Sequence, residues 1–309
     1  MRIAVIGAGG VGGYFGARLA AAGNDVQFLA RGRHLAAMRA GGLRIESDNG
    51  DLHLPQPDAT DDPSQLRIAD VVLVTVKLWD LAQTGRDIAP GVGPDTVVIP
   101  FQNGVEAVEV LGEAIPRERI AGGVAYISAT IREPGVVATT GKMAKLRFGP
   151  LQEAQRPVLD ALHIACKATG MDAEITLDIR RTLWEKFVFL NALSGVTAVS
   201  RQPVGVVRAD PDLRATMEAS MQETLRLAHA HGVALPEGMV AAQMEFLDSL
   251  SPAMRSSMQN DLAAGNRLEA PWLCGAVARM YAARGSVAPI NRTLFAALKP
   301  YIGGKAGQA

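Results

Sequence analysis

Cysteine is scarce in this sequence, which has only two among 309 residues, Cys166 and Cys274. They lie far apart in the chain and form no Cys-x-x-Cys pattern, so the sequence supports neither a disulfide scaffold nor a zinc ribbon. This usage is typical of a reducing compartment, and we expect the protein in the cytoplasm.

An excess of either charge is also absent, because 31 Lys and Arg residues balance 31 Asp and Glu residues. A general nucleic-acid-binding protein would carry a basic surplus, so nucleic acid is not an expected partner. Long hydrophobic runs are missing as well, since the longest strand-like run, residues 71–76, is far shorter than the roughly 20 residues of a membrane-spanning helix. We expect no membrane partner, and we interpret the glycine-punctuated N-terminus as part of the fold rather than as a secretory signal.

Motifs for metal or acyl chemistry are not found. The five histidines form no His-Glu-x-x-His motif, and His229 and His231 lie on different faces of a helix. No Gly-x-Ser-x-Gly turn is present to hold a nucleophilic serine. The sequence therefore predicts neither a metal ion nor acyl transfer.

Strand-like and helical segments alternate through the first half of the chain. Apolar strand-like runs occupy residues 2–6, 25–30, 69–76 and 95–104, and helical patterns cover 11–22 and 34–40. Asp48-Asn49-Gly50 is a strong hairpin signal between two short strands. Further strand-like segments lie at 120–130, 135–140 and 144–149, before a helical pattern at 151–168 and a strand near 171–177. This alternation predicts an α/β fold with a doubly wound, mostly parallel sheet.

Helical periodicity dominates from about residue 179 onward. The helical segments are 179–194, 211–231, 236–249, 271–284 and 290–298. Extended alternating runs are nearly absent from this part of the chain. The sequence therefore predicts two domains, a sheet domain over residues 1–178 and an all-helical domain over residues 179–309.

The first strand leads directly into a glycine-rich turn that matches Gly-x-Gly-x-x-Gly. Because the turn follows a strand and opens a helix, it is typical of dinucleotide binding rather than of a turn without a ligand, which is the alternative. Gly7 allows the tight turn, Gly9 lets the backbone approach the pyrophosphate, and Gly12 permits close packing. The helix N-terminus then attracts the phosphates. The expected cofactor-binding residues of this turn are Gly7, Ala8, Gly9, Gly10, Val11 and Gly12.

The end of the second strand indicates which dinucleotide binds. NAD sites place an Asp or Glu there to bond the ribose 2′-hydroxyl. This chain has Ala30-Arg31-Gly32-Arg33 instead. A guanidinium group suits the 2′-phosphate of NADP, so Arg31 favours NADPH. The alternative is that Arg31 is a solvated loop residue.

Two polar residues follow later strands, where open α/β sheets bind their ligands. Lys77 ends the run VVLVTVK, and Asn103 ends TVVIPFQN. We expect both side chains to face the cofactor. Lys77 could instead be a surface residue at the start of a helix, and Asn103 could be the N-cap of the helix that follows.

Lys186 lies on an apolar helical stripe rather than on a charged one. At 100° per residue, Leu183, Leu190 and, more loosely, Ser194 share its face. Burial on such a face lowers the pKa of a lysine, which makes it a usable proton donor. A solvated helical lysine is the alternative.

With these residues placed, the chain resembles the ketopantoate reductase (2-dehydropantoate 2-reductase) family over essentially its whole length. The matching signatures, in order, are GAGGVGGYFGARLA, VTVK followed by LWD, QNGV, REPG, LWEKFVFLNAL and RSSMQNDLAAGNRLE. The resemblance implies a Rossmann domain joined to a helical domain similar to that of the 6-phosphogluconate dehydrogenase group. It also implies that NADPH reduces a 2-oxo acid in a cleft between the domains, and that the helical domains pair in a homodimer.

The resemblance assigns roles to individual residues. Lys186 matches the family's proton donor, and Ser257 matches a ligand of the substrate carboxylate. Glu269, twelve residues after Ser257, matches the acid near the nicotinamide and the substrate hydroxyl. Cofactor contacts are implied for Lys77, for Asn103, which also contacts substrate, and for the backbone of Ala129.

The chain departs from the family on the substrate side. Many relatives carry asparagines four and eight residues after the lysine, where this chain has Leu190 and Ser194. Asn191 is about 140° further round the helix than Lys186 and cannot replace the first asparagine. A further substrate-side asparagine is matched by Val204. These substitutions affect the expected substrate, which Leu190 and Ser194 would contact, more than the expected reaction.

The predicted activity is reduction of a 2-oxo acid to a 2-hydroxy acid by NADPH. The family substrate is ketopantoate, which gives pantoate in pantothenate biosynthesis. One alternative is a relative that reduces a more apolar 2-oxo acid. The other is a non-catalytic protein that senses NADP, against which the presence of both Lys186 and Glu269 argues.

Overall fold

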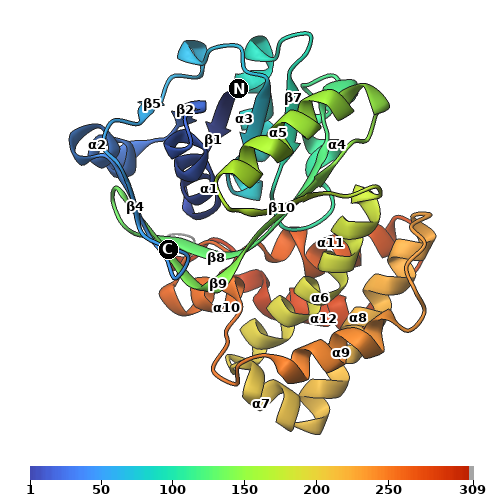
Figure 1. Ribbon diagram of the computed structural model, residues 1–309. Helices are drawn as coiled ribbons and strands as arrows, with labels where there is room; N and C mark the ends of the chain where they lie inside the picture. The colour runs from blue at the N-terminus through green and yellow to red at the C-terminus, as the bar shows by residue number, and fades with distance from the viewer. Residues whose placement is uncertain (306–309) are drawn as a thin grey trace. The chain divides into compact units, whose positions relative to one another are not determined.

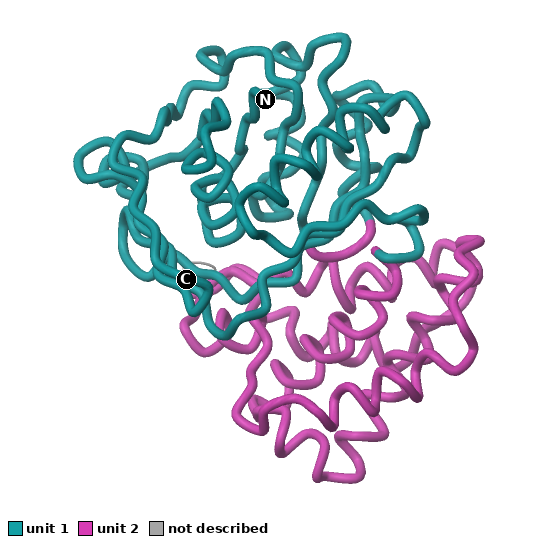
Figure 2. The backbone as a smooth tube through the Cα atoms, viewed as in Figure 1, with its two compact units in different colours: residues 1–102, 106–182 teal, residues 103–105, 183–309 magenta. Residues whose placement is uncertain are grey.

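The computed structural model describes residues 1–305, which divide into two compact units (Figure 2). Unit 1 contains Met1–Gln102 and Glu106–Thr182, and unit 2 contains Asn103–Val105 and the described chain from Leu183 onward. The division after Thr182 lies close to the predicted domain boundary after residue 178. The short segment Asn103–Val105 clusters with the helices of unit 2 although it follows a strand of unit 1.

The first sheet of unit 1 is wholly parallel, as predicted, with the strand order β5-β2-β1-β6-β7 (Figure 1). Its strands are β1 (Arg2–Ile6), β2 (Asp25–Leu29), β5 (Asp58–Thr60), β6 (Val71–Val74) and β7 (Val97–Pro100). Every residue of β6 and β7 is buried, which explains their continuous apolar sequences. The strand order reverses at β1, so ligands are expected at the carboxyl ends of β1 and β6.

Five α-helices connect or follow these strands. They are α1 (Gly10–Ala21), α2 (Gly32–Gly41), α3 (Leu81–Ile88), α4 (Ala107–Leu111) and α5 (Arg156–Ala168). Short 3₁₀ helices are η1 (Pro63–Gln65), η2 (Leu78–Asp80), η3 (Ala89–Gly91), η4 (Arg117–Arg119) and η5 (Glu153–Gln155). The helix predicted from residue 11 to residue 22 is α1, and Gly23 after it has a φ of 85°, as expected of a glycine that ends a helix.

A second sheet of unit 1 is mixed rather than parallel, which the sequence did not predict. Its strands are β3 (Leu43–Glu46), β4 (Leu52–Leu54), β8 (Gly122–Glu133), β9 (Val136–Gly149) and β10 (Asp172–Ile175). The predicted hairpin at Asp48-Asn49-Gly50 is confirmed, because β3 and β4 pair antiparallel around it. The strand-like segments at 135–140 and 144–149 form one strand, β9, which pairs antiparallel with β8.

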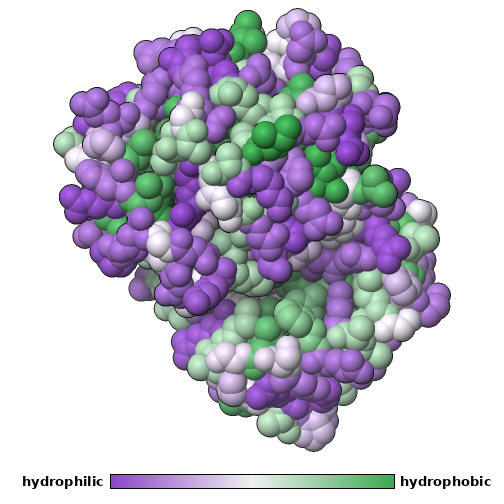
Figure 3. Space-filling view, in the orientation of Figure 1, coloured by the Kyte–Doolittle hydropathy of each residue, from purple (hydrophilic) through white to green (hydrophobic). Residues whose placement is uncertain are grey.

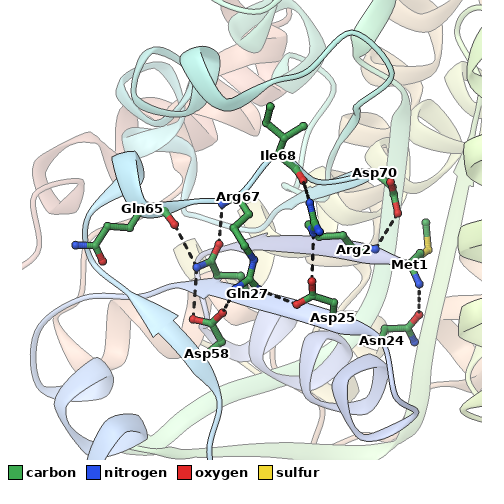
Figure 4. A network of polar contacts seen from close by, with 10 residues as sticks. All are labelled: Met1, Arg2, Asn24, Asp25, Gln27, Asp58, Gln65, Arg67, Ile68 and Asp70. Atoms are coloured by element: carbon green, nitrogen blue, oxygen red, sulfur yellow. Dashed lines mark hydrogen bonds and ion pairs between the residues drawn. The ribbon is translucent and has the colours of Figure 1, made fainter.

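Charged side chains at the amino ends of the first sheet pair with one another (Figure 4). Arg2 at the start of β1 lies 3.2 Å from Asp25 at the start of β2. Arg67 contacts Asp25 at 2.7 Å and Asp58 at 2.8 Å. These pairs are exposed and each contributes little to stability. On the face of unit 1 shown in Figure 3, hydrophilic residues predominate.

All the regular secondary structure among the described residues of unit 2 is helical, as predicted. Its helices are α6 (Ile179–Ser200, which begins in unit 1), α7 (Val204–Ala209), α8 (Pro211–Ala230), α9 (Met239–Ser249), α10 (Ser257–Ala264), α11 (Cys274–Ala282) and α12 (Pro289–Leu298), with η6 (Ala270–Trp272) and η7 (Lys299–Tyr301). Its apolar core includes Phe187 of α6, Met217 of α8 and Val277 of α11, each nearly inaccessible. None of the described helices is long and apolar enough to cross a membrane.

Candidate functional site

The glycine turn connects β1 to α1 at the carboxyl end of the parallel sheet. Gly7 has a φ of 99°, which favours glycine, and its N–H donates to the carbonyl of Leu29 at 2.9 Å. A Cβ at Gly12 would collide with the carbonyl of Gly7, so the helix approaches the strand as closely as the sequence predicts. A Cβ at Gly9 would have no atom within 4 Å. The backbone at Gly9 is thus open to a ligand, and the turn fits a pyrophosphate at the start of α1.

The backbone of Ala129 on β8 lies against this turn. A Cβ at Gly10, the first residue of α1, would collide with the Ala129 carbonyl. Only glycine therefore fits at position 10 without a shift of β8. This position beside the turn agrees with the predicted backbone contact to a cofactor, and that contact itself stays a prediction.

Arg31 follows β2 and precedes the first residue of α2. Its guanidinium lies 2.6 Å from the carboxylate of Asp80, the last residue of η2. The Arg31 side chain is nevertheless 81% exposed, so a ligand can reach it. Sequence reasoning identified Arg31 and missed Asp80, although Asp80 belongs to the Leu-Trp-Asp motif that follows Lys77.

Lys77 follows β6 at the same edge of the sheet as the glycine turn. It is exposed and directly precedes η2. Its position therefore agrees with the alternative interpretation, a surface residue at the start of a helix. Its Nζ lies 5.6 Å from the centre of the Trp79 ring, within the range of a cation–π contact. The structure therefore places Lys77 at the expected edge, and its contact with a cofactor remains a prediction.

Three of the predicted residues form a hydrogen-bonded chain within unit 2. Lys186 Nζ donates to Asn103 Oδ1 at 3.1 Å, and Asn103 Nδ2 donates to Glu269 Oε2 at 3.2 Å. The two bonds fix the orientation of the Asn103 amide, because its oxygen faces the ammonium and its nitrogen faces the carboxylate. The alternative that Asn103 caps a helix is wrong, since α4 begins at Ala107 and Glu106 is its N-cap.

The environment of Lys186 prepares it to give up a proton. Burial lowers the pKa of its ammonium to about 8, while the carboxylate of Glu269 acts in the opposite direction. The shift has the direction that the apolar stripe predicts. A lysine with this pKa is largely protonated at pH 7 and loses its proton more readily than a solvated lysine. Glu269 is only 7% exposed, so it is not the surface acid that spacing alone would suggest.

Of the other predicted substrate contacts, Leu190 and Ser257 are accessible to a ligand, and Ser194 is not. Leu190 is partly exposed one turn after Lys186 on α6. Ser194 is fully buried, and its hydroxyl has no hydrogen-bond partner among residues 1–305. Ser257 is exposed at the first position of α10. Val204 is fully buried in the helical core.

Sequence reasoning also missed the neighbour of Ser257. Ser256 is the N-cap of α10, where its Oγ accepts from the N–H of Gln259 at 3.1 Å. The same hydroxyl lies 2.7 Å from the hydroxyl of Thr197 on α6. The Ser-x-x-Gln spacing is typical of such a cap and could have identified it. Because Ser256 ties α10 to α6, Ser257 is the serine of this pair that remains exposed.

Comparison with known proteins agrees with these features. Residues 3–153 match the family model Ketopantoate reductase PanE/ApbA, and residues 178–301 match Ketopantoate reductase PanE/ApbA C terminal. The chain is 29% identical over 302 residues to the oxidoreductase YkpB of Bacillus subtilis, with 97% of this chain and 99% of YkpB covered. It is 30% identical over 295 residues to a 2-dehydropantoate 2-reductase of Halobacterium salinarum, with 95% and 96% covered.

A solved structure has the same fold over its full length. It is a PanE/ApbA family ketopantoate reductase from Ralstonia eutropha, 31% identical to this chain, with a TM-score of 0.90 and 100% of both chains covered. The match includes the parallel sheet and the helical unit described above. The chain therefore belongs to the ketopantoate reductase family and is an oxidoreductase of the NADPH-dependent 2-oxo acid reductase type.

Proposed function

We propose that this protein reduces 2-dehydropantoate to pantoate with NADPH. The observation that carries the proposal is the hydrogen-bonded chain Lys186–Asn103–Glu269 in a member of the ketopantoate reductase family. All three residues belong to unit 2, so one unit assembles the proton-donating group. A cytoplasmic location and the pairing of two chains stay predictions from the sequence.

The glycine turn and the residues around it would hold the cofactor. NADPH, when bound, supplies the hydride that reduces the C2 carbonyl of the 2-oxo acid. The N–H groups at the start of α1 would bind the pyrophosphate, since Gly9 leaves the backbone open. Arg31 would bind the 2′-phosphate, and Lys77, which follows β6, and the backbone of Ala129 on β8 would contact the cofactor.

Lys186 would act as the general acid. As the C2 oxygen gains negative charge, the ammonium stabilises this charge and then delivers its proton to the oxygen. Asn103 accepts one N–H of the ammonium at 3.1 Å and so orients it. Glu269 favours the protonated lysine, while burial favours the neutral amine. The opposed effects keep the pKa near the working pH, where a general acid is most effective.

The substrate carboxylate would bind at the start of α10. Ser257 is exposed there with a hydroxyl donor, and the first turn of a helix attracts anions. Leu190, which is partly exposed, would line the remainder of the substrate site along α6, on the same stripe as Lys186. The full burial of Ser194 argues against the substrate contact predicted for it.

Leu190 favours a second candidate, a reductase for 2-oxo acids with an apolar tail. Its methyl groups lie one turn from Lys186, at a position where many relatives carry an amide. A substrate hydroxyl facing these methyl groups would lose its hydrogen bonds to water, at a cost of about 1–3 kcal/mol. Ketopantoate has such a hydroxyl at the end opposite its carboxylate.

Two substrates that differ by this hydroxyl separate the candidates. Ketopantoate and 3,3-dimethyl-2-oxobutanoate share their carbon skeleton up to the terminal hydroxyl, so NADPH oxidation is measured with each. We expect the protein to reduce ketopantoate, with a kcat/KM that is at most modestly higher than that for 3,3-dimethyl-2-oxobutanoate. A clear preference for 3,3-dimethyl-2-oxobutanoate would support the second candidate. Binding of NADPH without oxidation by any member of a 2-oxo acid panel would contradict both and favour a sensor.

A further inference from the structure

The ion pair between Arg31 and Asp80 joins two segments that flank the cofactor turn. Arg31 follows β2 and Asp80 ends η2, which follows β6. In the sheet, β2 and β6 lie on either side of β1, and β1 leads into the glycine turn. The pair therefore lies at the ligand-binding edge of the sheet, unlike the ion pairs of the amino edge in Figure 4.

Helix capping does not explain the position of the Asp80 side chain. It is the N-cap residue of α3, but its side chain accepts no hydrogen bond from that helix. Its carboxylate instead lies 2.6 Å from the guanidinium of Arg31. The two side chains are 81% and 30% exposed, and a pair with this exposure contributes little to stability.

The carboxylate of Asp80 has opposite effects on the two nicotinamide cofactors. The 2′-phosphate of NADPH would have to share Arg31 with a carboxylate, and two anions near each other repel. The ribose of NADH has a 2′-hydroxyl instead, which can donate to a carboxylate. In NAD-specific folds of this type, an acid at the end of the second strand accepts this bond, and this chain has none there.

We propose that Asp80 is a specificity-determining residue for the cofactor. It supplies from the β6 side the ribose acceptor that is missing after β2, and it weakens the preference of Arg31 for the 2′-phosphate. The protein therefore binds both NADPH and NADH, and its preference for NADPH is smaller than Arg31 alone would produce. The inference rests on the proposed cofactor site but not on the identity of the 2-oxo acid.

Cofactor titrations test this directly. The dissociation constants of NADPH and NADH are measured by nucleotide fluorescence with the full chain, for the wild type and for Asp80→Asn. We expect Asp80→Asn to bind NADPH more tightly and NADH more weakly. The ratio of the two constants should shift toward NADPH by about tenfold, the lower end for a hydrogen bond to a charged group. No 2-oxo acid is present, so a wrong substrate assignment leaves the result intact.

Asp58→Asn is the matched control, because Asp58 is also an exposed aspartate paired with an arginine, Arg67 at 2.8 Å, but at the amino edge of the sheet. This variant should leave both dissociation constants unchanged. Asp80→Ser is a second variant that removes the charge, and it should shift the ratio in the same direction. An unchanged ratio in both Asp80 variants, or an equal change for both cofactors, would overturn the proposal.

Discussion

Unit 2 contains two hydrogen-bonded networks that use the same pair of residue types. In one, Asn103 Nδ2 donates to Glu269 Oε2 at 3.2 Å. In the other, Asn291 Nδ2 donates to Glu223 Oε2 at 2.7 Å. An asparagine next to a buried glutamate is therefore not in itself a sign of a catalytic site.

The network around Glu223 is buried and joins helices α6, α8 and α12. Its carboxylate accepts from the backbone N–H groups of Ile290 and Asn291 in the first turn of α12, where a negative charge is favourable. Asn191 of α6 donates to Asn291 Oδ1 at 2.6 Å and to Thr224 of α8 at 3.0 Å. Glu223, Thr224 and the two asparagines are at most 3% exposed. Asn191 thus serves helix packing on the side of α6 away from Lys186.

The network around Glu269 differs from the network around Glu223 because it includes a lysine, Lys186, that can lose its proton near neutral pH. Lys186 contacts Asn103, and burial lowers the pKa of Lys186 to about 8. Lys186 and Asn103 are also partly exposed, whereas Asn191 and Asn291 are inaccessible. A perturbed titratable group that a ligand can reach is what distinguishes a catalytic network from a structural one.

The largest effect should come from removing the proton donor. Lys186→Ala should lower kcat by roughly 10²–10⁴-fold, the usual contribution of a general acid. NADPH affinity should be nearly unchanged, and Lys186→Gln should not restore turnover, because an amide cannot deliver the proton. Steady-state kinetics with saturating substrate measure this, with Lys167→Ala of the exposed face of α5 as the control. Near-normal turnover by Lys186→Ala would make the lysine structural.

The two asparagines should respond in opposite ways to the same substitution. Asn291→Leu leaves the Glu223 carboxylate and the Asn191 amide short of partners, so it should destabilise the fold by about 1–3 kcal/mol. The kcat of the folded variant should stay within a few-fold of the wild type. Asn103→Leu should lower kcat and cost less stability, because Asn103 is partly exposed. Urea unfolding and kinetics on both variants decide this, and equal losses of kcat would remove the contrast.

The next effect concerns the substrate side of α6. Leu190→Asn adds an amide one turn after Lys186, which can bond a substrate hydroxyl. The ratio of kcat/KM for ketopantoate to that for 3,3-dimethyl-2-oxobutanoate should rise by about tenfold, as for one hydrogen bond. Leu190→Met keeps an apolar side chain and should leave the ratio unchanged. A ratio that does not move in Leu190→Asn would mean that Leu190 does not face the substrate hydroxyl.

A smaller effect is expected from the carboxylate of the catalytic network. Glu269→Gln removes the negative charge that raises the pKa of Lys186 but keeps an oxygen for Asn103. The pKa of Lys186 should fall further, so the loss of activity at high pH should begin about one pH unit lower than in the wild type. Asp58→Asn in unit 1 should leave the pH profile unchanged. An unshifted profile in Glu269→Gln would exclude electrostatic control of Lys186 by Glu269.

Local patterns in the sequence predicted the elements that depend on neighbouring residues. The buried strands β6 and β7, the glycine turn and the β3–β4 hairpin all follow from short stretches of chain. The second sheet could not be predicted in this way, because one of its two parallel pairs joins Arg44 of β3 to Val136 of β9, which are far apart in sequence. Composition and periodicity carry no information on such pairings.

The candidate site follows the same rule. The apolar stripe predicted the lowered pKa of Lys186, because its cause lies on the same helix. The contacts of Asn103 with Lys186 and Glu269 join residues separated by 83 and 166 positions, and only the folded chain brings them together. The pairing of Asp80 with Arg31, 49 positions away, was missed for the same reason.

The pH dependence of kcat in the wild-type protein shows whether Lys186 is the proton donor. Lys186 must be protonated to donate its proton, and burial lowers its pKa from the usual 10.5 of a lysine to about 8. With NADPH and the 2-oxo acid both saturating, kcat for the reduction should be level below about pH 8 and should fall about tenfold per pH unit above it. A kcat that stays level through pH 10 would contradict the assignment of Lys186 as the proton donor.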